Sequence, residues 1–283
     1  MNIELGNQKL RIKVTTPMTA CMVEYGPRFE TLGAVTSWIC DGNSLLAREG
    51  LIDEFNIQAP LTPPGYDVAK PGEPFVKIGV GELIRTDDKG YSFSYPHPVQ
   101  CLAPVTMDRD GDVLKLSQQM QSATGWGYAY AKTYRLFPDA TTLVIEYSLK
   151  NIGELPLNAE QYDHNWFNFG GGAIDDNYFL ETRFGVGEPA GDWFKYSGQR
   201  FDLTRLIERG SYSPSPMGAP ASENWMRIGH RARGQSIVVT GDFDVARFAL
   251  YADATAFCPE VFGEFKLAAG QSMSWQRKYE FCR

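Results

Sequence analysis

The chain contains 283 residues, of which 43% are hydrophobic and 22% are charged, as in ordinary water-soluble globular proteins. No long uncharged apolar run is present, and the net charge of -7 comes without a cluster of lysines or arginines, so neither a membrane nor a nucleic acid is an expected partner. The five cysteines are odd in number and widely spaced and the N-terminus shows no secretory signal, which predicts mostly reduced cysteines and a cytoplasmic location.

Patterns typical of β-strands recur along the whole chain. Alternating or β-branched and aromatic runs are bounded by Gly, Asn and Asp, whereas few windows show the three-and-four spacing of a helix. The expected strands are residues 10–16, 29–40, 112–122, 127–137, 141–152, 226–232, 235–243, 247–254 and 272–281. One helix is expected at residues 202–210, which Asp202 opens and Gly210 closes. The pattern as a whole predicts an all-β fold.

Two segments interrupt this rhythm. Residues 53–76 contain five prolines, and residues 185–224 are rich in Gly, Pro and Ser, so both are expected to be long surface excursions. Long ordered loops on a β-sandwich often form the wall of a binding site. Strand patterns resume directly after each segment and no internal repeat occurs, which predicts that residues 1–283 form a single domain.

One of the three histidines lies in an aromatic segment, residues 158–172, which reads NAEQYDHNWFNFGGG. If this segment is extended, Tyr162, His164 and Trp166 share one face of the strand. An imidazole titrates near neutral pH, so a histidine between two aromatic rings is suited to give a proton and take it back within one turnover. A structural histidine packed in an aromatic core is the alternative interpretation.

The residues around this segment also carry a resemblance to a known family. In chain order they are Asn151, Gly153, Pro156, Asn158, His164, Trp166, Phe167, Asn168 and Phe169. This order resembles the galactose mutarotase (aldose 1-epimerase) superfamily, in which N-x-G/D and P-x-N precede a motif of the type N-H-[ST]-Y-F-N-L. Residues 23–46 and 265–281 resemble the opening hairpin and the closing strand of that family, although Ala269 and Gln271 replace the usual proline and glutamate.

The resemblance implies a large antiparallel β super-sandwich and an aldose 1-epimerase, an isomerase of carbohydrate metabolism that interconverts the α and β anomers of a sugar. The ring opens when a base takes the C1 hydroxyl proton and an acid protonates the ring oxygen. This chemistry needs no metal or nucleotide, and the sequence shows neither a phosphate-binding glycine loop nor histidines at metal-ligand spacing, so no cofactor is expected. The expected partner is a small-molecule sugar or sugar derivative.

The resemblance also implies which residues form the site. Glu260 corresponds to the base of the family, which lies on a strand shortly before the closing motif, with Glu264 as the competing glutamate. His164 corresponds to the acid. His97 falls where the family has a second histidine of the catalytic site, in a segment like L-H-G-G, and Arg85 falls where an arginine holds sugar hydroxyls, so the resemblance implies that both orient the hydroxyls of the sugar. Here, however, His97 lies between two prolines, and only the last arginine of the expected G-R-x-x-N-R pattern is present.

Aromatic side chains can stack on the apolar face of a sugar. Tyr162, Trp166 and Trp126, which is flanked by glycines, are the expected residues for this contact. Structural roles compete with these assignments, namely a loop histidine at His97, a salt-bridged arginine at Arg85 and core packing at Trp126. Because the departures from the family pattern affect the expected sugar contacts, a carbohydrate-binding or sensing protein without catalysis is the alternative function.

Overall fold

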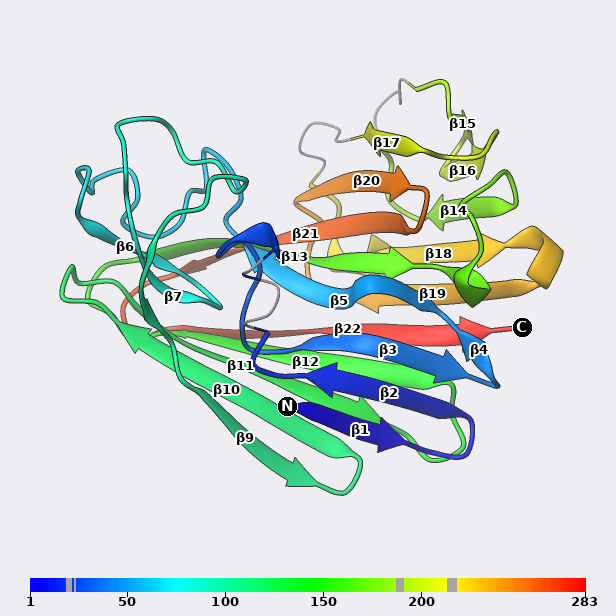
Figure 1. Ribbon diagram of the computed structural model, residues 1–283, viewed down its shortest axis with the longest axis horizontal. Helices are drawn as coiled ribbons and strands as arrows, with labels where there is room; N and C mark the ends of the chain where they lie inside the picture. The colour runs from blue at the N-terminus through cyan, green and yellow to red at the C-terminus, as the bar shows by residue number, and fades with distance from the viewer. Residues whose placement is uncertain (19–21, 23, 187–190, 213–217) are drawn as a thin grey trace.

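The computed structural model describes residues 1–18, 22, 24–186, 191–212 and 218–283. Across these residues the strands form three antiparallel sheets of nine, ten and three members, and three short 3-10 helices also occur (Figure 1). The two large sheets pack against each other through a shared apolar core. The structure therefore confirms the expected all-β antiparallel sandwich.

The first large sheet combines strands that follow one another near the N-terminus with strands from later segments that are distant from one another in the chain. In spatial order it contains β1 (Asn2–Gly6), β2 (Leu10–Thr15), β3 (Ala34–Cys40), β5 (Leu46–Phe55), β13 (Leu157–Phe167), β21 (Phe257–Leu267), β20 (Arg247–Asp253) and β17 (Arg209–Tyr212), with β4 (Asn43–Ser44) paired to β3. β13 thus lies between β5 and β21, which come from opposite ends of the chain.

The second large sheet contains, in spatial order, β15 (Phe194–Ser197), β16 (Arg200–Leu203), β14 (Tyr178–Thr182), β18 (Trp225–His230), β19 (Gln235–Gly241), β22 (Ser272–Cys282), β12 (Thr142–Asn151), β11 (Gly127–Leu136), β10 (Val113–Gln121) and β9 (Val105–Asp110). The small sheet contains β6 (Pro74–Lys77), β7 (Gly81–Ile84) and β8 (Val99–Leu102), and β6 and β7 stand at one end of the large sheets (Figure 1). The 3-10 helices are η1 (Phe169–Gly171), η2 (Ala221–Glu223) and η3 (Arg231–Arg233).

A layer of polar side chains crosses the interior of the sandwich. Lys132 of β11 forms an ion pair with Asp53 of β5 at 2.6 Å, and Tyr279 of β22 donates a hydrogen bond to Asp163 of β13 at 2.8 Å. Side chains alternate between the two faces of a strand. Because the odd-numbered residues of β13 face the second sheet, its even-numbered residues, including His164, lie on the opposite face.

All of the expected strands are present with shifted ends, and the largest shift is at residues 29–40. There β3 begins only at Ala34. The preceding residues are buried but lie outside the sheet ladder, since the Thr31 N–H donates to the carbonyl of Gly79. At Gly33 the chain passes so close to Leu116 that an added Cβ would lie 2.5 Å from its Cδ1 atom. The segment therefore crosses the interior before it joins the sheet.

The helix expected at residues 202–210 is wrong. Phe201 and Leu203 are buried on either side of Asp202 in β16, which is the two-residue period of a strand. The carboxylate of Asp202 accepts hydrogen bonds from Arg200 and Arg231 in place of capping a helix. Arg209 and Gly210, the last two residues of the expected helix, begin β17, which ends at Tyr212.

The two expected excursions are only partly irregular. Residues 53–55 are the end of β5 and residues 74–76 belong to β6, so the first loop is shorter than expected. The second segment contains β15, β16, β17 and η2, while residues 187–190 and 213–217 lie outside the described part of the chain.

Four of the five cysteines lie in the described part of the chain. Cys40, Cys101, Cys258 and Cys282 are free thiols, in agreement with the expected reduced state, and Cys21 lies outside the described residues. No helix in the described ranges has both the length and the apolar character needed to span a membrane.

Candidate active site

The candidate site lies on the face of β13 that points away from the second sheet. The backbone ladder between β13 and β21 is interrupted between the pairs made by Gln161 and by Phe167. Within this gap, Pro259 of β21 has no N–H to donate to a ladder. The side chain of Asn165 donates to the carbonyl oxygen of Pro259 at 2.8 Å. The two strands are thus held together while their side chains His164 and Glu260 lie opposite each other.

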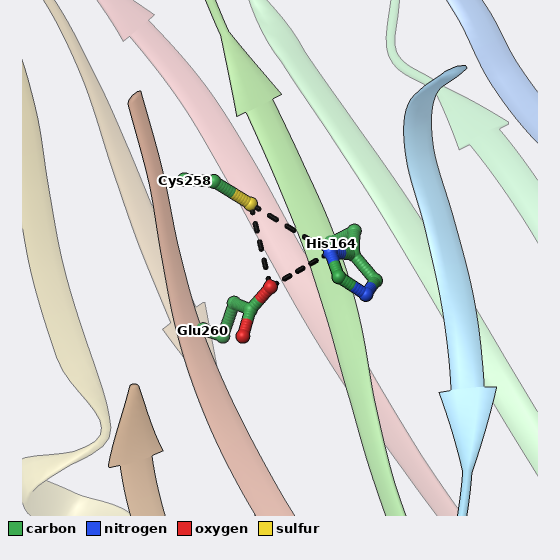
Figure 2. A group of neighbouring side chains, drawn as sticks. All are labelled: His164, Cys258 and Glu260. Carbon is green, nitrogen blue, oxygen red and sulfur yellow. Dashed lines mark hydrogen bonds and ion pairs between the residues drawn. The ribbon is translucent and has the colours of Figure 1, made fainter. Parts of the chain in front are cut away.

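His164 and Glu260 form a buried acid–base pair (Figure 2). His164 Nδ1 lies 2.7 Å from Glu260 Oε1, and the two side chains are only 7% and 8% exposed. Cys258 Sγ, on the same face of β21, lies 3.5 Å from the same carboxylate oxygen. Burial and the nearby Glu260 charge raise the pKa of the Cys258 thiol, so the thiol stays protonated and donates to Glu260. Glu264, the competing glutamate, is exposed further along β21.

The donor atoms of His164, Cys258 and Glu260 all lie within 4.8 Å of one another, which raises the question of a metal ion. Two ligands of one tetrahedral zinc ion lie about 3.3 Å apart, because each is about 2.0–2.3 Å from the metal. The 2.7 Å between Nδ1 and Oε1 is instead a charge-assisted hydrogen bond. The spacing of these residues fits a hydrogen-bonded acid–base group and does not fit a zinc site.

The other ring nitrogen of His164, Nε2, faces a second polar group. Tyr162 Oη lies 2.5 Å from this nitrogen and 2.5 Å from Glu54 Oε2. Arg28 donates from Nε to Glu54 at 2.8 Å, and one of its terminal nitrogens lies 3.2 Å from both Tyr162 Oη and His164 Nε2. Each nitrogen of the imidazole is therefore linked to a carboxylate, Nδ1 directly to Glu260, and Nε2 to Glu54 both through the phenol and by a longer direct contact of 3.5 Å.

The charges around His164 determine its protonation. Burial by itself would lower the pKa of His164, because the charged imidazole loses its water. The charge of Glu260, its hydrogen bond and the hydrogen bond with Glu54 outweigh burial and raise this pKa above its usual value. Burial would likewise raise the pKa of Glu54, but Arg28, the bond to His164 and Lys77 lower it to about 2. The site therefore favours a protonated imidazole, the form that can act as a general acid near neutral pH.

Aromatic rings surround this polar group. Phe29 meets the His164 ring edge-on with centroids 4.9 Å apart, and Trp166 stacks on the same ring at 5.6 Å. The ring of Tyr162 stacks on Phe262 at 4.2 Å. The alternation expected from the sequence thus places Tyr162, His164 and Trp166 on one face. Apolar rings around a few polar groups are the usual composition of a site for a small ligand.

The other expected site residues lie outside this group. Arg85 donates to the carbonyl oxygens of Tyr66, Ala69, Asp87 and Lys89, at 2.8–3.0 Å, so its guanidinium holds a loop. His97 is buried and stacks on Tyr91 at 5.6 Å, and a chain of contacts runs from Tyr91 to Lys77 and Glu54. Trp126 lines a separate hollow of about 300 Å³ with residues 60–65 and Leu155.

The position of Arg85 predicts a structural effect. Arg85→Ala removes four hydrogen bonds from a charged donor to backbone carbonyls, so we expect the free energy of unfolding to fall by about 1–3 kcal/mol. The affinity for a sugar should not change. Urea unfolding and titration calorimetry measure the two quantities. Arg135→Ala, which removes a half-exposed ion pair with Glu146, is the control and should cost at most about 1 kcal/mol. Weaker sugar binding with unchanged stability would instead support the sugar contact expected from the sequence.

Two residues of the site were missed at the level of sequence. The prolines that follow Glu54 predict a surface excursion, although Glu54 lies in β5, one residue before its end at Phe55, and pairs with Tyr162. Arg28 precedes β3, and its side chain lies over the rings of Phe29 and Phe93, at 4.7 and 4.2 Å. The continuous apolar and acidic run LIDEF at residues 51–55 is the sequence signal that could have indicated a strand containing Glu54.

Comparison with known proteins identifies the fold. No family model matches the sequence, and no curated protein matches it. Among solved structures, the chain is similar to a galactose mutarotase-like protein from Lactobacillus casei, with a TM-score of 0.60, 16% identity and 100% of both chains covered. It is also similar to a galactose mutarotase related enzyme from Lactobacillus acidophilus, with a TM-score of 0.61, 10% identity and coverage of 100% of this chain and 98% of the other. An aldose epimerase homologue from C. elegans gives a TM-score of 0.58, 14% identity and coverage of 100% and 99%.

Proposed function

Because the chain has the galactose mutarotase-like fold, we propose that it is an aldose 1-epimerase-like isomerase, acting on a sugar or sugar derivative at His164 and Glu260. The observation that carries the proposal is the buried pair itself, in which an imidazole and a carboxylate lie 2.7 Å apart among aromatic rings. Anomer exchange needs one proton acceptor and one proton donor at neighbouring oxygens of the sugar. This pair supplies both. We further propose that the whole chain acts as one domain and that it does so in the cytoplasm.

The proposed mechanism begins when the sugar replaces the hydrogen bond between His164 Nδ1 and Glu260 Oε1. The C1 hydroxyl donates to Glu260, and Nδ1–H donates to the ring oxygen. Glu260 takes the hydroxyl proton as the C1–O bond to the ring oxygen breaks, and the ring oxygen takes the Nδ1 proton, so an open-chain aldehyde with one new hydroxyl results. After rotation about C1–C2, the hydroxyl closes on the other face of C1 and both protons return. Catalytic hydrogen bonds of this kind often form fully only with substrate present.

A binding or sensing protein is the second candidate. It is favoured by the positions of Arg85 and His97, since neither of these two expected sugar contacts joins His164 and Glu260. A fold does not by itself determine activity. A protein of this class would bind a sugar without changing how fast its anomers exchange.

The test is the relaxation of freshly dissolved α-glucose and α-galactose to their anomeric mixtures, followed by polarimetry. We expect catalytic amounts of the protein to accelerate the relaxation of at least one sugar beyond the rate in buffer. His164→Asn serves as the matched control for general buffer effects and should remove the acceleration. If neither sugar relaxes faster while calorimetry shows that it binds, the binding protein is the correct assignment.

A further inference from the structure

Apart from its contact with Glu260, His164 contacts a second hydrogen-bonded group, which consists of Tyr162 and Glu54. Tyr162 Oη lies within 2.5 Å of both His164 Nε2 and Glu54 Oε2. A phenol has one hydrogen to donate and can accept another. When Nε2 carries a proton, that proton is donated to Tyr162, whose own hydrogen is donated to Glu54. The three groups then form a continuous chain from the imidazole to a carboxylate.

Glu54 is held as an anion at the end of this chain. It is fully buried, and its two oxygens face Arg28 at 2.8 Å and Lys77 at 3.8 Å. Burial would raise the pKa of Glu54, but these neighbours lower it to about 2. Burial and the Glu54 charge raise the pKa of Tyr162, so the phenol keeps its hydrogen at any ordinary pH. The chain therefore ends on a permanent negative charge.

Arg28 has the opposite effect on Nε2, because it disfavours a proton on this nitrogen. A guanidinium can only donate hydrogen bonds, so its 3.2 Å contact with Nε2 is attractive only when that nitrogen has no proton. Glu54 also contacts Nε2 directly at 3.5 Å. Among the described residues, the other groups that face the imidazole are Glu260 and Cys258 on β21, and the Cys258 thiol is neutral. Two carboxylates thus favour the imidazolium, and one guanidinium opposes it.

We propose that Glu54, acting through Tyr162, is a positioning residue that keeps the second proton on His164, while Arg28 limits how tightly that proton is held. The inference rests on the proposed function, because it assigns supporting residues to the acid of that reaction. When Nδ1 gives its proton to the ring oxygen, Nε2 keeps its own proton on Tyr162, and the imidazole is left neutral. Return of the proton to Nδ1 then restores the positive charge between the two carboxylates.

The first experiment is an NMR titration of the His164 ring in the full chain, which requires no substrate. The chain has three histidines, so the signal that disappears in His164→Asn identifies the residue. We expect the pKa of His164 to fall in Glu54→Gln and Tyr162→Phe and to rise in Arg28→Met, where Lys77 still faces Glu54. Glu146→Gln, which removes a half-exposed carboxylate on the second sheet, is the control and should leave this pKa unchanged.

Activity provides the second readout. Since the protonated imidazole is the active acid, lowering its pKa moves the alkaline limb of the profile of kcat against pH to lower pH. We expect Glu54→Gln to lose about tenfold more activity at the alkaline end of the profile than at neutral pH. A purely structural role would lower kcat equally at every pH. An unchanged His164 pKa in Tyr162→Phe, or a lower one in Arg28→Met, would overturn the inference even if Glu54→Gln does not fold. Failure of the wild type to accelerate mutarotation would instead refute the proposed function, while the titration still decides this inference.

Discussion

Glu260→Gln is expected to lower kcat for mutarotation by about 10²–10⁴-fold with little change in KM. The amide has nearly the same volume as the carboxylate, and its oxygen can still accept a hydrogen bond from Nδ1, so the fold and the shape of the site should persist. It cannot, however, take the C1 hydroxyl proton. Because that proton moves only in the transition state, the loss belongs to kcat. Polarimetry at several sugar concentrations measures kcat and KM separately.

Glu264→Gln is the matched control for this prediction. Glu264 lies four residues further along β21, on the same face of the strand, but its side chain is exposed and has no contact with His164 among the described residues. The activity of the Glu264→Gln variant should equal that of the wild type. If Glu264→Gln loses kcat while Glu260→Gln retains it, the base has been assigned to the wrong glutamate.

His164→Asn is the second large effect, with an expected loss in kcat of about 10²–10⁴-fold. Asparagine keeps a polar group on β13 but cannot carry a proton between oxygens. The double variant His164→Asn with Glu260→Gln should lose little more than either single variant, because residues that act as one unit give non-additive losses. The measurement compares the mutarotation rates of the wild type, the two single variants and the double variant. Losses that multiply would mean that the two residues contribute independently, contrary to the proposed exchange of protons at one sugar.

Local pattern predicted much of the fold and one face of the site. Among the long strands, the alternating runs predicted β10, β11, β12 and β22, because a half-buried strand repeats every two residues wherever it lies, whereas β5, β13 and β21 were not among the expected strands. The same period placed Tyr162, His164 and Trp166 on a common face, which the stacking of Trp166 on His164 reflects. The prediction failed at residues 202–210, where a helix-like beginning at Asp202 was outweighed by the burial of Phe201 and Leu203 in β16.

The partners of His164 depended on information that local pattern does not contain. The choice of Glu260 came from family resemblance, since no spacing rule connects residues 164 and 260. Glu54 was missed because the proline-rich stretch after it suggested a loop, and Arg28 was missed because no motif marks it. Arg85, which the resemblance favoured as a sugar contact, donates its hydrogen bonds to loop carbonyls.

The sequence by itself determined the all-β class and which side chains of β13 share a face, because these depend on the repeat of apolar and polar residues within one strand. Only the tertiary structure decided that β5 and β21 flank β13, which brings Glu54 and Glu260 to opposite nitrogens of His164. Strand order is decided by how the whole core packs, and these partners are separated from His164 by about a hundred residues of chain. The charges that hold a proton on the imidazole are therefore a property of the assembled sheet.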